Sequence, residues 1–77
     1  MNHTRRGTLN NFANKIQQLR NEVETLRDEE ETCRDNIPEN MQNTERYNKS
    51  DEAVAALTEV VDYLDSALES IVNAIAD

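Results

Sequence analysis

The sequence has few of the residues that stabilise most small domains. Its 77 residues include no Trp, one Phe and one Cys, and only 36% of them are hydrophobic. Cys33 has no partner for an intramolecular disulfide, and a lone cysteine is typical of a reducing compartment. Since so short a chain buries little of its surface, we expect one domain that gains stability by associating with another chain.

The residues needed for common chemistries are also scarce. His3 is the only histidine and Gly7 the only glycine, which excludes clustered-histidine metal sites, histidine-based catalytic constellations and Gly-rich phosphate loops. The acidic run 28–31 lacks the spacing and the glycine of a calcium loop, and favours a solvated helix face. We therefore predict a protein that is not an enzyme and that uses no metal or cofactor.

Long apolar runs are absent as well. No segment approaches the roughly 18 apolar residues of a membrane span. Arg5 and Arg6 are not followed by an apolar stretch, so the N-terminus does not resemble a signal peptide. We expect a cytoplasmic protein that does not engage a membrane.

Two heptad repeats are what the chain does contain. Each keeps 3-4 spacing, which places its members on one stripe of an α-helix. The first stripe is Leu9, Phe12, Ile16, Leu19, Val23, Leu26, Glu30 and Cys33. The second stripe is Tyr47, Ser50, Val54, Leu57, Val61, Leu64, Leu68, Ile71 and Ile75.

The first stripe predicts a helix over residues 9–35. We expect residues 1–7 to form a flexible tail, with Thr8 or Asn10 capping the helix through a side-chain oxygen. Together with the second helix this makes a single domain over residues 1–77.

The second stripe predicts a helix over residues 45–76. Pro38 cannot continue a helical ladder, so residues 36–43 are expected to form the connection. Thr44 is the predicted N-cap of the second helix, and a later start at Ser50 is the competing possibility.

Folding the chain back at Pro38 matches the stripes as an antiparallel, coiled-coil-like hairpin. In this register the one charged stripe residue, Glu30, faces Ser50, the one serine of the two stripes, and the pair helps to fix the alignment. The flanking positions then pair Arg20 with Asp65 and Arg34 with Asp51.

The second helix has a wider apolar face than one partner can cover. Every seventh residue beside its stripe is small or apolar: Ala53, Val60, Ala67 and Ala74. We therefore predict that two hairpins pack through these residues as a homodimeric four-helix bundle, with a larger oligomer as a further possibility. The alternative is that these residues are surface positions filled by good helix formers.

Charge is unevenly distributed in this chain of net charge −8. Residues 1–20 carry four bases and no acid, whereas residues 50–77 carry seven acids and no base. Within a hairpin the basic start can neutralise the acidic end. Alternatively, the acidic face binds a protein with a basic surface, while direct binding to nucleic acid is disfavoured.

The arginines Arg20, Arg27 and Arg34 form a stripe of their own beside the seam of the first helix. They either pair with neighbouring acids or, in an oligomer, line a cleft for an anionic ligand such as a nucleotide.

The connection, D-N-I-P-E-N-M-Q-N-T-E-R-Y over residues 35–47, is the most distinctive stretch. With the acidic, Ala-rich helix after it, it resembles small uncharacterised helical-hairpin proteins of Firmicutes and their phages, which share a D-N-x-P-E-N-x-Q loop. The segment is either a plain connector or a ligand or partner site near a helix N-terminus. The candidate site residues are Asn36, Asn40, Gln42, Arg46 and Tyr47.

These patterns favour a small, non-enzymatic helical interaction protein that binds a partner protein. The alternative is a phage-encoded inhibitor of bacterial defence. Such an inhibitor would act as an acidic decoy for a nucleic-acid-binding protein, or as an oligomeric sponge for a nucleotide signal.

Overall fold

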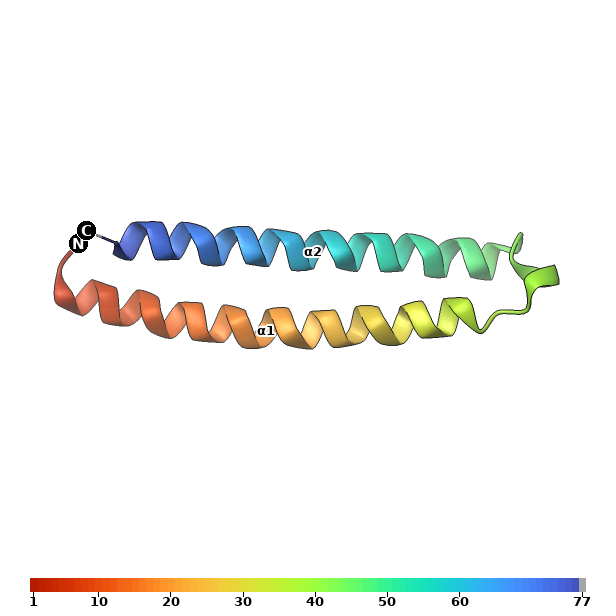
Figure 1. Cartoon of the computed structure of the whole chain (residues 1–77), viewed down its shortest axis with the longest axis horizontal. Helices are drawn as coiled ribbons and strands as arrows, with labels where there is room; N and C mark the ends of the chain where they lie inside the picture. The colour runs from red at the N-terminus through yellow and green to blue at the C-terminus, as the bar shows by residue number, and fades with distance from the viewer. Residues whose placement is uncertain (77) are drawn as a thin grey trace.

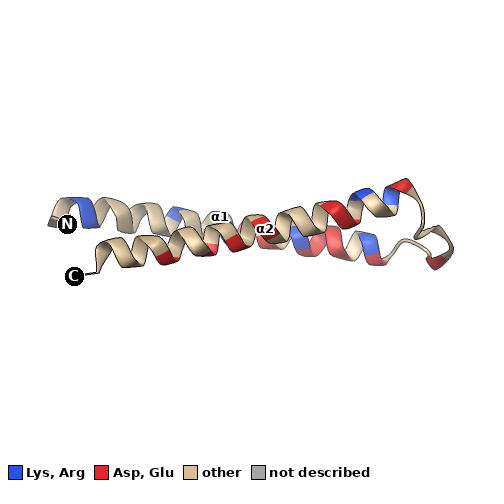
Figure 2. Cartoon of the chain, turned by 90° about the horizontal axis from the view of Figure 1, so that it is seen from above, with Lys and Arg blue, Asp and Glu red and all other residues tan. Residues whose placement is uncertain are grey.

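The computed structural model describes residues 1–76, which form two long helices joined by a short connection (Figure 1). Helix α1 spans His3–Asp35, the 3-10 helix η1 spans Glu39–Met41, and α2 spans Glu45–Ile75. The helices run antiparallel and side by side in both perpendicular views (Figures 1 and 2). The result is a rod of 59 × 15 × 13 Å, all-α over the residues described.

Helix α1 begins earlier than the sequence suggested. The Asn2 side chain accepts a hydrogen bond from the Arg5 backbone N–H at 2.8 Å, so Asn2 is the N-cap. The prediction of a flexible tail over residues 1–7 is therefore wrong, as is capping by Thr8 or Asn10. The Thr8 hydroxyl instead donates to the Thr4 carbonyl within the helix, at 3.1 Å. Gly7 has an ordinary negative φ within this helix. A single glycine costs a helix about 1 kcal/mol relative to alanine, which a long helix tolerates.

The connection turns tightly after α1. The Asn36 N–H donates to the Thr32 carbonyl at 3.0 Å, and Pro38 then prevents the ladder from continuing. The Met41 N–H closes a turn back to the Pro38 carbonyl at 2.8 Å. Ile37 is buried against the open end of the seam, at 6% exposure.

Helix α2 starts where its cap predicts. The Tyr47 N–H donates to the Thr44 hydroxyl at 3.4 Å, while that hydroxyl donates to the Met41 carbonyl at 2.7 Å. The competing start at Ser50 is wrong, because this cap already satisfies the first turn. At its other end α2 stops at Ile75, one residue before the predicted limit, where Ala76 takes an extended backbone.

The centre of the seam lies on α2. Val54 and Val61 are 8% and 3% exposed, whereas none of the α1 residues in the described chain is fully buried. Two helices alone therefore leave many of the stripe residues partly exposed to solvent. Neither helix, over the residues described, is both long and apolar enough to cross a bilayer.

We expect Thr44→Ala to lower the free energy of unfolding by about 1 kcal/mol, because the Tyr47 N–H loses its acceptor at the start of a packed helix. Asn2→Ala is the matched control at the opposite end, where the first turn can open locally, so its global cost should be smaller. Urea denaturation followed by circular dichroism at one protein concentration measures both. Equal losses would contradict this difference between the two caps.

Candidate interaction surface

The rod has two unlike long sides, which we call the paired side and the groove side. On the paired side, ion pairs cross from α1 to α2. Arg20 Nε lies 2.9 Å from Asp65 Oδ1, and Arg34 Nη1 lies 2.8 Å from Asp51 Oδ1. Both pairs are those that the predicted register requires.

The arginines of the paired side are all bonded to carboxylates of the same chain. The hydrogen bond from Arg20 to Asp65 raises the pKa of Arg20, and the bond from Arg27 to Asp28 raises the pKa of Arg27. The hydrogen bond to Asp35 likewise raises the pKa of Arg34. Their environment matches the first interpretation of this stripe, pairing with neighbouring acids.

The groove side is apolar and open. Three large α1 side chains, Phe12, Leu19 and Leu26, remain 47%, 50% and 57% exposed, although they belong to the heptad stripe. Facing solvent on the same side of α2, Val60 is 39% exposed. We define the groove face by the members of these two rows: Phe12, Leu19, Leu26 and Cys33 of α1, and Ala53, Val60, Ala67 and Ala74 of α2.

Two adjoining cavities mark the groove between these rows. One, of about 450 Å³, is lined by Leu26, Glu29, Glu30, Cys33, Ala53 and Leu57. A larger one, of about 610 Å³, lies at the loop end and shares Glu30 and Cys33 with the first. The groove is therefore continuous from the middle of the rod to the loop, on the side opposite the interhelical ion pairs.

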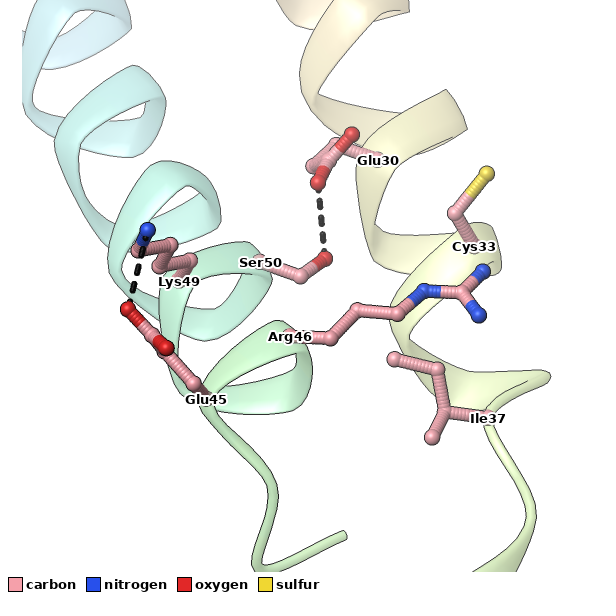
Figure 3. Close-up of a pocket in the computed structure, with 7 residues that line it drawn as sticks. All are labelled: Glu30, Cys33, Ile37, Glu45, Arg46, Lys49 and Ser50. Atoms are coloured by element: carbon pink, nitrogen blue, oxygen red, sulfur yellow. Dashed lines mark hydrogen bonds and ion pairs between the residues drawn. The ribbon is translucent and has the colours of Figure 1, made fainter. Parts of the chain in front are cut away.

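The loop-end cavity contains the polar layer of the seam (Figure 3). The Ser50 hydroxyl donates to a Glu30 carboxylate oxygen at 2.7 Å, and Ser50 is 8% exposed. Arg46 extends across the opening toward Cys33, and the Lys49 ammonium pairs with Glu45 at 3.0 Å. No ion pair joins Arg46 to a carboxylate within residues 1–76.

The candidate loop site does not assemble as a unit around this cavity. Of its five residues, Arg46 alone is among the side chains that line it. Asn36 instead ends α1, and Asn40 and Gln42 lie in and directly after η1. Tyr47 is half-buried on α2. These residues separate because η1 carries the chain away from both helices before α2 begins.

The four α1 members of the groove face were not identified as surface residues from the sequence. Their heptad positions assign them to the core. Only the width of the apolar face of α2 indicates that part of the seam stays uncovered. The positions of α1 next to the groove are polar, for example Lys15 and Glu22, so α1 cannot cover that width. Its own stripe residues are left half exposed as a result.

Charge divides the rod into two halves (Figure 2). The loop half, residues 21–60, holds twelve acids and four bases, a formal charge of −8. The terminal half, residues 1–20 and 61–76, holds four bases and three acids, a formal charge of +1. The acidic character of the protein is thus concentrated around the loop end.

Within residues 1–76, no group of three or more His, Cys, Asp or Glu side chains is arranged to hold a metal ion. The fold and the surface define the chain as an antiparallel helical hairpin with one side closed by ion pairs and one apolar side open. No protein-family model, no curated protein and no solved structure matches the chain.

We expect Ser50→Ala to lower the free energy of unfolding by about 2 kcal/mol, because the half-buried Glu30 carboxylate loses its donor. Ser66→Ala, the same change at an exposed position of α2, should cost less than about 0.5 kcal/mol. Urea titration at a fixed protein concentration compares the two. Similar values for both variants would show that the polar layer does not contribute to stability.

Proposed function

We propose that this chain is a non-enzymatic helical interaction protein that works as a homodimeric four-helix bundle. Two hairpins meet through their groove faces, and the acidic loop half of each remains available to a protein with a basic surface. The observation that carries the proposal is the row of half-exposed Phe12, Leu19 and Leu26 beside the open groove.

The apolar area left in the groove supports a second copy as its occupant. Covering the exposed half of one Leu side chain contributes about 1 kcal/mol, and each hairpin offers several such side chains. Ala53 and Ala67, both half-buried, allow a second helix to approach within the usual 8–10 Å or so between helix axes. A second hairpin supplies the same apolar rows in return, which makes the contact self-complementary.

Val60→Gln tests the association. It places an amide in the middle of the groove face, and we expect the mass in solution to fall from twice 8.8 kDa toward 8.8 kDa at micromolar concentration. Val72→Gln is the matched control, since Val72 is more exposed, at 64%, but lies outside the groove face. Light scattering coupled to size exclusion gives both masses. A monomeric parent chain would overturn the proposal.

The concentration of charge supports the second part of the proposal. A surface with a formal charge of −8 along half of the rod attracts basic partners and raises their rate of encounter. The same property suits the more specific role of an acidic decoy that occupies a nucleic-acid-binding protein. The engagement of Arg20, Arg27 and Arg34 by carboxylates makes the decoy a better candidate than a nucleotide sponge.

Paired charge removals test where a basic partner binds. Glu52→Gln with Glu59→Gln removes two exposed carboxylates from the loop half, and Asp62→Asn with Glu69→Gln removes two from the terminal half. With a lysine 20-mer as the probe, we expect the first double variant to weaken binding more than the second does. The measurement is made at about 0.15 M salt, where electrostatic interactions are screened beyond ~8 Å. Calorimetric titration measures the affinities, and equal losses would contradict a loop-half site.

A further inference from the structure

We propose that the two hairpins associate antiparallel, so that the loop end of each lies beside the terminal end of the other. This inference rests on the association proposed above and adds its direction. Two arrangements would bring the groove faces together. In one the two-fold axis runs along the rod, and in the other it crosses the rod, and the charges and the spacing of the groove residues favour the second.

Helix α2 presents a row with a centre of symmetry. From Arg46 every seventh residue faces the groove: Arg46, Ala53, Val60, Ala67 and Ala74. A two-fold axis at Val60 sets Val60 against its own copy and Ala53 against the partner's Ala67. Large side chains therefore meet only at the centre, and small ones on either side of it let the two α2 helices approach closely.

The same axis gives Arg46 a role. It brings Arg46 beside the partner's Ala74, in the last turn of α2. The carbonyls at a helix C-terminus carry partial negative charge, and within α2 no Lys or Arg follows Lys49. Arg46, which has no ion pair within residues 1–76, would thus lie at a helix end whose own last turn holds no basic residue.

Helix α1 is symmetric about nearly the same level. An axis at Leu19 sets Leu19 against its copy, Phe12 near the partner's Leu26, and Lys15 near the partner's Glu22. Because Glu30 faces Ser50, residue 20 of α1 is level with Val60 of α2. The two centres therefore differ by one residue, or about 1.5 Å along the helix.

Net charge favours the same direction. The arrangement with the axis along the rod places two loop halves, each with a formal charge of −8, side by side. Helices about 8–10 Å apart lie within roughly one Debye length at physiological salt, so this repulsion is only partly screened. In the antiparallel arrangement each loop half instead meets a terminal half with a formal charge of +1.

A distance measurement between spin labels tests the direction. A ketone-bearing amino acid in place of the exposed Glu39, coupled to a nitroxide, labels the loop end and leaves Cys33 unchanged. We expect a label-to-label distance close to the 59 Å length of the rod. A second variant labelled in place of the exposed His3 should also give a long distance, of about 50 Å from the helical rise.

The outcomes separate the two proposals. A dimeric mass with label distances of about 20 Å, the width of two packed helix layers, would overturn the direction and leave the association intact. A monomeric mass without an intermolecular signal would overturn both. A dimeric mass with long distances at both labels supports both.

Matched substitutions test the role of Arg46. We expect Arg46→Gln to raise the dissociation constant of the dimer about threefold or more, since each dimer loses two interactions with helix ends. Lys49→Gln removes the same charge one turn away, where Lys49 already pairs with Glu45, and should leave that constant nearly unchanged. Equal effects of the two variants would overturn the placement of Arg46.

Discussion

The hydrogen bond from Ser50 to Glu30 determines how the two helices align. Within an otherwise apolar seam, a carboxylate facing an aliphatic side chain would lose its hydration without compensation, so any other alignment costs free energy. With this layer in place, Arg20 and Arg34 reach Asp65 and Asp51 across the seam. The position of the groove and the level of every residue along it follow from the same alignment.

That alignment also makes the two sides of the rod unequal. On one side, the long side chains of Arg20 and Arg34 bridge the helices to Asp65 and Asp51. On the other, Lys15 and Glu22 of α1 face a row of alanines and Val60, which are too short to cover the large α1 residues. When one side of a helical pair is bridged by ion pairs and the other is open, a second hairpin can pack only against the open side. The hypothesis of a four-helix bundle depends on this asymmetry.

The sequence predicted the parts of the fold that depend on repeated, local signals. Heptad spacing and the Thr44 cap located α2, and matching the stripes gave the register that the ion pairs show. The start of α1 was missed because Asn2 lies before the first stripe residue, where no apolar period indicates a helix. A helix capped by one side chain can extend through polar residues and a glycine, and no apolar spacing in the sequence marks that extension.

The surface was harder to predict than the fold. Heptad positions do not state how exposed a residue is, because exposure depends on the size of the side chains flanking it on the other helix. Phe12, Leu19 and Leu26 therefore looked like core residues in the sequence. In the loop, η1 redirects the backbone, so Arg46 lines the loop-end cavity and Asn40, although close to it in sequence, does not.

The uniform heptads along both arms make the length of this rod adjustable. Seven residues add two helical turns, or roughly 10 Å, and return the stripe to the same face. An insertion in α1 alone, on the terminal side of Glu30, would shift the layers beyond it out of register, whereas insertions of seven residues at the same level in both arms would leave every existing layer matched. Relatives with longer or shorter arms should therefore differ by paired multiples of seven residues, with the same turn and the same cross-section.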